Sequence, residues 1–348
     1  MAWRSFLFSL IFFVILFVAT EIILRIALVC YGYPFLKPGD YLYTGFYPTL
    51  KEMIGKDIRS DDEVQDILIL GGSVISTPWS NMEMRLDTIL QKKYGKSKKF
   101  AFYNTAAAGH TSLDNLIKYK LLADKRFDLV IYYEAINENR ANCIPDKDFR
   151  ADYAHIKWYS DIYLLQAHPE INFTVIPYVC GLVIRGVRDK VTRKVYVSQD
   201  MVDPGFAKFG SNIKTALPYR ENLTNMINIS NKRGDALLLM KYASYFPEGV
   251  KLTGEQKDMD HFAGCHYASP VTIWGQADNV KKGIQSHNQI LTDLAKRKQT
   301  HFFDMAANMP QDGRFFCDVC HVSELGAQNF ASKLAGHLID SRLLEHSD

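Results

Sequence analysis

The stretch "QDILILGG", residues 65–72, is a short apolar run closed by two glycines. A continuous apolar run of this length is typical of a strand that is buried on both faces of a sheet. The segment that follows, "NMEMRLDTILQKKYG" (81–95), has apolar residues at helical spacing and ends in glycine, a common helix terminator. The two segments together predict a strand followed by a helix.

The same alternation continues to the C-terminus. Further strand-like runs are "KKFAFYNTA" (98–106), "FDLVIYYEA" (127–135), "DALLLMKYA" (235–243) and "THFFDMA" (300–306). Helical spacing recurs between them in "SLDNLIKYKLLADK" (112–125) and "VKKGIQSHNQILTDLAKRK" (280–298). Buried strands that alternate with helices predict an α/β fold, in which helices cover both faces of a parallel sheet of about five strands.

The residues just past the predicted strands carry the chemistry, because ligands of parallel α/β sheets bind outside the carboxyl ends of the strands. These residues are Ser73 in "GGSV", Gly109 in "NTAAAGHTS", Asn137 in "AINEN", and Asp318 and His321 in "FFCDVCHVSELG". A serine nucleophile needs a base, a group that orients the base, and donors for the oxyanion. All four parts fall on one predicted edge of the sheet.

The last of these stretches has a second interpretation. Cys317, Cys320 and His321 spell C-x-x-C-H, the attachment signature of c-type haem. Here, however, the motif follows the last strand of a predicted α/β sheet, whereas c-type haem normally belongs to a small helical domain. We therefore predict no haem and no other cofactor. The two cysteines are expected to pack beside the acid, or to form a disulfide with each other or with Cys265.

A second group of metal-ligand side chains lies in "DMDHFAGCHY" (258–267), after the fourth predicted strand. Its acidic, histidine and cysteine residues are spaced irregularly, unlike the paired ligands of zinc sites. We interpret this segment as a polar or substrate-contacting loop and predict no metal site.

From about residue 64 to the C-terminus, the chain resembles the SGNH hydrolases, also called GDSL-like esterases. The four blocks of that family appear in order as "LGGSV", "NTAAAGHT", "AINEN" and "DVCHVSELGAQNFASKLAGHL". The last block is the most specific, because its D-x-x-H is followed by a loop glycine, Gly326, and an amphipathic helix. Two positions depart from the usual pattern: Gly72 stands where many members carry aspartate, and Ala135 stands where glycine is usual.

The resemblance implies a three-layer α/β/α, flavodoxin-like sandwich and a serine esterase that works through an acyl-enzyme. It implies that Ser73, His321 and Asp318 form the catalytic triad. It also implies that the oxyanion hole consists of the Ser73 N–H, the Gly109 N–H and the Asn137 side chain. The substrate does not follow from the resemblance, since residues 141–233 look like an insertion without a counterpart in the minimal fold.

The N-terminus, "MAWRSFLFSLIFFVILFVATEIILRIALVC", is a membrane-directed segment. Residues 5–20 carry no charge, and an interfacial Glu21 extends the segment close to the roughly 20 residues that span a bilayer. Small residues at the spacing of a signal-peptidase site are lacking. We therefore predict an uncleaved transmembrane anchor over residues 1–30, in which Glu21 and Arg25 pair on one helical face.

The predicted organisation is this anchor, a linker over residues 31–63, and a hydrolase domain over residues 64–348. The positive charges that flank the anchor do not decide its orientation. A single N-terminal span before more than 300 soluble residues favours a domain outside the cytoplasm, either periplasmic or at the cell surface. Six cysteines suit either compartment.

Charge argues against a nucleic-acid partner, because the formal net charge is only +3 and no long basic run occurs. The densest basic stretch is "RGVRDKVTRK" (185–194), in which Val187, Val191 and Val195 recur at helical spacing. We interpret it as the solvated face of a helix, with contact to a membrane surface as the alternative.

Residues 141–233 also contain an aromatic cluster, for which packing against the protein is favoured over stacking on a sugar ring. Its members are Tyr153, Trp158, Tyr159 and Tyr163.

Together, these observations predict a membrane-anchored, extracytoplasmic serine esterase. Its expected substrate is an O-acyl ester, with acetyl as the expected acyl group, on a carbohydrate or cell-envelope glycan. One alternative is an O-acyltransferase that uses the same site on a polysaccharide. The alternative of another class is a catalytically silent, membrane-tethered glycan-binding or assembly protein. The expected partners are the acylated substrate and the membrane, and the sequence identifies no protein partner.

Overall fold

The computed structural model describes residues 2–59, 63–199, 201–254 and 273–345. The chain forms two compact units. The first, here called the N-terminal unit, comprises Met1–Ile54 and Lys157–Tyr196. The second, here called the sheet unit, comprises Gly55–Ile156 and Val197–Asp348.

The sheet unit contains a five-stranded parallel sheet in the order β2-β1-β3-β4-β5, which is the order of flavodoxin-like sheets. The strands are β1 (Val64–Gly71), β2 (Lys99–Asn104), β3 (Leu129–Tyr133), β4 (Ala236–Met240) and β5 (His301–Phe303). β2 to β5 each lie within one of the apolar runs of the sequence, and β1 begins one residue before the run at 65–72. The central strands β1, β3 and β4 are almost fully buried, whereas the edge strands β2 and β5 are partly exposed. The predicted parallel sheet is thus confirmed.

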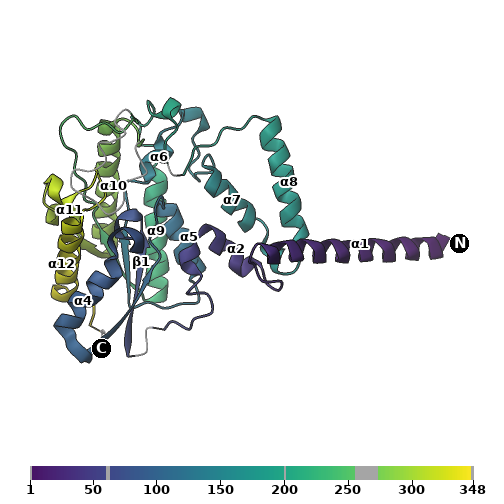
Figure 1. Ribbon diagram of the computed structural model, residues 1–348, viewed down its shortest axis with the longest axis horizontal. Coiled ribbons are helices and arrows are strands. Elements are labelled where there is room, and N and C mark those ends of the chain that lie inside the picture. The colour runs from purple at the N-terminus through teal and green to yellow at the C-terminus, as the bar shows by residue number, and fades with distance from the viewer. Residues whose placement is uncertain (1, 60–62, 200, 255–272, 346–348) are drawn as a thin grey trace. The chain divides into compact units, whose positions relative to one another are not determined.

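Helices cover both faces of this sheet (Figure 1). On one face α4 packs against α12, and on the other α5 packs against α9, which in turn packs against α10. Their bounds are α4 (Met82–Tyr94), α5 (Ser112–Leu121), α9 (Ala216–Arg233), α10 (Ala277–Lys298) and α12 (Glu324–Asp340). This is the three-layer α/β/α sandwich that the resemblance implies.

Shorter helices connect these elements. They are α3 (Thr77–Ser80), α6 (Glu138–Asn142) and α11 (Met305–Asn308), together with the 3₁₀ turns η2 (Ser73–Ile75), η3 (Gly95–Ser97), η4 (Asp146–Asp148), η6 (Pro204–Phe206) and η7 (Gly313–Phe315).

The N-terminal unit is helical. Its elements are α1 (Ala2–Cys30), α2 (Gly39–Phe46), η1 (Pro48–Leu50), α7 (Lys157–Gln166), η5 (Pro169–Asn172) and α8 (Ile176–Val191). They share a small apolar cluster, whose buried members are Leu42, Leu165, Ile171, Val175 and Tyr178. Part of the segment predicted as a linker, residues 31–54, therefore folds together with residues 157–196. The rest of the predicted insertion includes α9, which is the crossover helix between β3 and β4.

Helix α1 is long and apolar enough over Trp3–Cys30 to cross a membrane. The apolar side chains from Phe6 to Val18 are all exposed. Glu21 and Arg25 form the ion pair that their spacing predicts, with 2.6 Å between Arg25 Nε and Glu21 Oε1. Both then reach beyond the helix, because Arg25 donates to Phe173 O at 3.0 Å and Glu21 accepts from the Val175 N–H at 3.0 Å. The end of α1 is therefore part of the folded N-terminal unit.

Most of the aromatic cluster serves packing, as favoured from the sequence. Tyr153 and Tyr159 are fully buried. Trp158 packs edge-on against Phe46 and Tyr47, with ring centroids 5.2 and 6.0 Å away. The buried Tyr153 and Tyr159 rings are therefore not available for stacking on a sugar.

The basic stretch at 185–194 begins on a solvent-exposed helix, as interpreted, but the apolar side of that helix is exposed too. It belongs to a helix, α8, and the two turns after it, and Val187, Val191 and Val195 are exposed. Arg188 and Lys190 are exposed as well, which agrees with a solvated helix face, and no described residue covers the apolar side.

Candidate active site

The candidate nucleophile stands on a sharp turn after β1. Gly72 is extended, and Ser73 begins the 3₁₀ turn η2 immediately after it. The turn packs closely against the end of β3: a Cβ on Gly71 would lie 2.6 Å from Tyr133 O, and a Cβ on Gly72 would overlap with the Glu134 carboxylate. Both positions therefore require glycine, and the tight turn presents the Ser73 hydroxyl at the carboxyl edge of the sheet.

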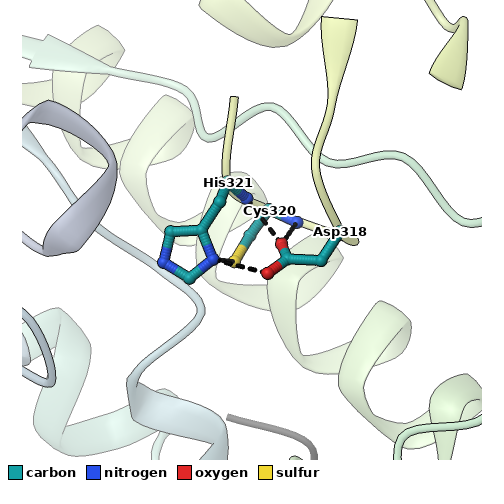
Figure 2. Close-up of side chains that lie close together, drawn as sticks. All are labelled: Asp318, Cys320 and His321. Carbon is teal, nitrogen blue, oxygen red and sulfur yellow. Dashed lines mark hydrogen bonds and ion pairs between the residues drawn. The ribbon is translucent and has the colours of Figure 1, made fainter. Parts of the chain in front are cut away.

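Three predicted site residues form a continuous chain of short hydrogen bonds. Ser73 Oγ lies 2.6 Å from His321 Nε2, and His321 Nδ1 lies 2.6 Å from Asp318 Oδ2. The other Asp318 oxygen accepts the backbone N–H groups of His321 at 2.7 Å and Cys320 at 2.9 Å. Figure 2 shows this carboxylate facing the imidazole. The pairing with Asp318 favours the tautomer that carries a proton on Nδ1 and leaves Nε2 as the acceptor for Ser73.

The Asp318 carboxylate is ionised at neutral pH. Burial alone would raise its pKa, but the attraction of the His321 ring and three hydrogen bonds from His321 and Cys320 outweigh burial and lower the pKa below the usual range. A buried, ionised carboxylate can stabilise an imidazolium that forms when the histidine accepts a proton.

The D-x-x-H loop is held by its own backbone. The Cys317 N–H donates to His321 O at 2.7 Å, and Ser323 then caps α12 by accepting from the Gly326 N–H at 3.1 Å. Gly326 lies in the first turn of α12, so its description as a loop glycine is corrected. A side chain at this position would overlap with Phe315 O, which explains the glycine.

Trp79 is a site residue that sequence reasoning missed. Its ring lies 4.0 Å from the His321 ring, centroid to centroid, at an interplanar angle of 35°. Its Nε1 donates to Val322 O at 3.3 Å, next to the histidine. The indole therefore restricts the orientation of the imidazole. The available signal was weak: a tryptophan six positions after Ser73 in "STPWS".

Two backbone N–H groups suit an oxyanion. Gly109 has a φ of +78°, a conformation that favours glycine. Among the described residues no acceptor is found for its N–H. Ser73 is the first residue of η2, so its N–H has no partner within that turn.

The Asn137 side chain lies in the same region, but its amide group already donates hydrogen bonds within the protein. Its Nδ2 donates to His110 O at 3.0 Å, next to Gly109, and to Glu134 Oε2 at 3.0 Å. Both amide hydrogens are used in this way, so a contact with an oxyanion requires one of these bonds to be exchanged. The oxyanion role of Asn137 stays a prediction.

A buried polar network lies behind Asn137, and the sequence did not predict it. Glu134 Oε1 accepts the Asn137 N–H at 2.6 Å, and burial raises the pKa of Glu134 from 4.5 to about 8. Lys118 Nζ donates to Thr105 O at 2.6 Å and lies 3.1 Å from His110 Nδ1. Burial lowers the pKa of Lys118 to about 7. In the sequence, this network was indicated only by a charged residue inside each of two largely apolar segments, Glu134 in 127–135 and Lys118 in 112–125.

The cysteines do not fit haem attachment. Cys317 is disulfide-bonded, whereas Cys320 is a buried free thiol. A disulfide between these two cysteines, one of the alternatives left open by the sequence, is therefore wrong. Haem attachment needs two thiols, and Cys317 cannot offer one. Cys265 lies outside the described residues. So does the whole segment 258–267, so its interpretation as a polar or substrate-contacting loop stays a prediction.

Asp318, Cys320 and His321 also have potential metal-ligand atoms within 4.8 Å of one another (Figure 2). Thiolate, not thiol, binds metals. Burial and the neighbouring Asp318 raise the pKa of Cys320 well above its usual value, and His321 Nδ1 is occupied by Asp318. This donor set fits a proton relay and does not fit a metal centre.

The four blocks of the resemblance thus meet at the carboxyl edge of a β2-β1-β3-β4-β5 sheet. The sheet unit has the three-layer α/β/α fold and the flavodoxin-like strand order that the resemblance implies. No protein-family model matches the sequence, and no curated protein matches it.

Solved structures of a lipase, an esterase and an acylhydrolase are similar in fold. A GDSL-like lipase from Bacteroides thetaiotaomicron is 11% identical, with a TM-score of 0.44, over 87% of this chain and 98% of its own. An acetyl xylan esterase from Geobacillus stearothermophilus is 12% identical, with a TM-score of 0.43, over 81% and 96%. A putative acylhydrolase from Bacteroides fragilis is 12% identical, with a TM-score of 0.42, over 86% and 95%. At such low identity the roles of residues rest on the contacts within this chain.

Proposed function

We propose that this SGNH-like chain is a membrane-anchored serine esterase that hydrolyses an O-acyl ester on a carbohydrate or cell-envelope glycan. One observation carries the catalytic part of the proposal. The Ser73 hydroxyl, the His321 imidazole and the Asp318 carboxylate are joined by two contacts of 2.6 Å. This is the distance and order that a nucleophile, a base and an orienting acid require.

The first half of the reaction forms an acyl-enzyme. Ser73 Oγ attacks the ester carbonyl carbon while His321 Nε2 takes the hydroxyl proton, and Asp318 stabilises the resulting imidazolium. The N–H groups of Ser73 and Gly109 donate to the oxyanion, joined by the Asn137 amide once it releases a present partner. The tetrahedral intermediate then collapses, and Nε2 returns the proton to the departing alcohol oxygen.

The second half reverses these roles. Water approaches the acyl carbonyl, His321 Nε2 accepts its proton, and the same donors stabilise the second oxyanion. Collapse of this intermediate releases the carboxylic acid and returns the proton to Ser73. If a sugar hydroxyl takes the place of water, the same steps transfer the acyl group, so the acyltransferase alternative uses identical residues.

The relay also argues against the catalytically silent alternative. A glycan-binding protein needs no serine hydroxyl within hydrogen-bond distance of an imidazole. It also has no need of a buried, ionised Asp318 behind that imidazole, because an isolated buried charge costs stability.

An uncleaved anchor is supported by the contacts of Glu21 and Arg25. Arg25 is buried, and together the two side chains bind three backbone groups of residues 172–175. Cleavage after α1 would remove these partners and leave part of the N-terminal unit without its contacts. The disulfide at Cys317 favours an oxidising compartment, in agreement with a catalytic unit outside the cytoplasm.

The experiment that tests the proposal supplies an acyl donor and candidate acceptors together. Detergent-solubilised full-length protein is incubated with an activated acetyl ester and acetylated or unacetylated oligosaccharides, and free acetate and acetylated sugar are quantified by mass spectrometry. We expect free acetate in excess, and none from the Ser73→Ala variant. More acetylated sugar than free acid makes the protein a transferase, and turnover by Ser73→Ala refutes the proposed mechanism.

A further inference from the structure

Helix α8 presents a stripe of apolar side chains that no described residue covers. These side chains recur at spacings of one, three and four residues, so they lie on one face of the helix. Their exposed fractions are 62% for Val183, 67% for Ile184, 58% for Val187 and 77% for Val191. Helices of soluble proteins turn such a stripe toward the core. Here the stripe faces away from it.

The opposite face of α8 is the one that holds the helix in place. Tyr178 belongs to the buried apolar cluster of the N-terminal unit. Arg185 Nη2 pairs with Asp161 at 2.6 Å, and Asp189 Oδ2 accepts from the Tyr196 hydroxyl at 2.6 Å. The helix is thus attached through the face opposite the stripe, which leaves the stripe for another partner.

Basic residues border the exposed stripe. Residues 185–194 contain five basic residues and one acidic residue. Arg188 and Lys190 are both exposed and flank the stripe on its two sides. Long basic side chains of this kind can bury their apolar stems while their charged ends reach a polar, anionic layer. An apolar stripe bordered by cations is complementary to the surface of an anionic bilayer.

The position of α8 along α1 agrees with such a surface. The uncharged run of α1 ends at Thr20, and Glu21 accepts the Val175 N–H directly before α8 begins. Arg25 holds the carbonyl of Phe173, whose own side chain is 87% exposed. Figure 1 shows α8 running across α1 instead of alongside it. A helix that crosses the end of a membrane span lies along the membrane surface.

We propose that α8 is an interfacial helix that binds the anionic phospholipid surface at the end of α1. Val183, Ile184, Val187 and Val191 enter the boundary between headgroups and acyl chains, and the flanking basic residues contact lipid phosphates. This inference rests on the proposed membrane anchoring by α1. Two contacts with the same membrane, one spanning and one lying on it, fix the orientation of the N-terminal unit.

The test places an environment-sensitive fluorophore at single cysteines of the full-length chain. The exposed Cys30 and Cys180 are first replaced by serine. Val187→Cys and Val191→Cys report on α8, Val14→Cys reports on α1, and Gln285→Cys on the exposed side of α10 is the matched control. Each protein is reconstituted in vesicles of phosphatidylglycerol and phosphatidylcholine, with and without quencher lipids. The quencher lies near the headgroup for residues 187, 191 and 285, and at the end of the acyl chain for residue 14.

We expect blue-shifted emission and lipid quenching at residues 187 and 191, and neither at residue 285. Arg188→Glu combined with Lys190→Glu should reduce the quenching at residue 187, as should vesicles of phosphatidylcholine alone. Quenching at residue 14 without quenching at residues 187 and 191 leaves the anchor in place and overturns the α8 proposal. Disulfide cross-links between Val187→Cys chains, formed without lipid quenching, assign the stripe to a second copy and also overturn it. Loss of quenching at residue 14 refutes the anchoring itself.

Discussion

The carboxylate of Glu134 occupies the space that a Cβ on Gly72 would need, and Asn137 Nδ2 lies 2.7 Å from the same point. The turn that presents Ser73 and the end of β3 therefore fit together only because residue 72 has no side chain. This contact gives a physical reason for the departure from the family pattern at Gly72. The carboxylate of Glu134, the residue just after β3, fills the place that a side chain from the turn would take.

The first prediction concerns this contact. Gly72→Ala must displace Glu134 or the turn, so it should destabilise the fold by about 1–3 kcal/mol, the typical cost of overpacking. Because the displaced turn carries the nucleophile, the esterase rate should fall at least about tenfold. Urea unfolding and a short-chain ester assay measure both effects.

The control for this substitution is Gly336→Ala in α12, where a new Cβ meets nothing within 4 Å. Alanine in a helix interior should be neutral or stabilising by up to about 1 kcal/mol. If Gly72→Ala behaves like this control, the contact with Glu134 has no functional weight.

Glu134 also predicts a pH dependence of stability. Burial raises its pKa from 4.5 to about 8, so between these values the folded chain holds a proton that the unfolded chain has released. The stability that Glu134 contributes is complete below about pH 4.5 and is lost as the pH rises to about 8. Glu134→Gln cannot lose this contribution, so the variant should gain stability relative to the wild type between pH 5 and pH 8. A stability difference that stays constant over this range, measured by urea unfolding, means that the Glu134 pKa is not raised.

Trp79 is predicted to act through His321. Trp79→Ala removes the ring that packs on the imidazole and the hydrogen bond to Val322 O, so the imidazole gains orientations that do not face Ser73. We expect kcat to fall about tenfold or more with little change in KM, since substrate binding does not depend on the relay. Trp79→Phe keeps an aromatic ring and should recover part of the loss. The matched control is Trp3→Phe in α1, and equal effects at both tryptophans refute the role of Trp79.

Asn137 is predicted to donate to the oxyanion. Asn137→Ala should lower turnover on the order of a hundred- to a thousandfold, about 3–4 kcal/mol, while Ser73 stays reactive toward an irreversible probe. An effect below about fivefold removes Asn137 from the hole and leaves the backbone donors of Ser73 and Gly109 to act alone. Steady-state kinetics and probe labelling of the same preparation separate the two results.

The sheet could be predicted because its strands are buried on both faces, which makes runs such as residues 67–70 continuously apolar. The C-terminal end of the last strand was harder to predict, because its apolar run continues to residue 306. β5 ends at Phe303, since the Asp304 side chain accepts the Ala307 N–H and so begins α11. The meeting of Ser73, Asp318 and His321 followed from residue types at the carboxyl ends of parallel strands, a position that topology fixes.

Other features depend on contacts that spacing does not encode. Glu134 meets Gly72 only after β1 and β3 pair. Glu21 and Arg25 were predicted to bind each other, but their partners at residues 172–175 lie far away along the chain. Helical spacing identified the apolar stripe of α8 but could not tell whether the rest of the protein covers this stripe. The same periodicity serves a protein core and a membrane surface equally well.

The nucleophile itself is the central claim, and labelling with a fluorophosphonate probe tests it most directly. The probe reacts with a serine hydroxyl only when a base activates it. Detergent-solubilised wild-type protein should become covalently labelled at Ser73, and the exposed-site control Ser341→Ala should label equally. Ser73→Ala should lose both labelling and ester hydrolysis while it unfolds at the same urea concentration as the wild type. Undiminished labelling of the folded Ser73→Ala variant would contradict the account.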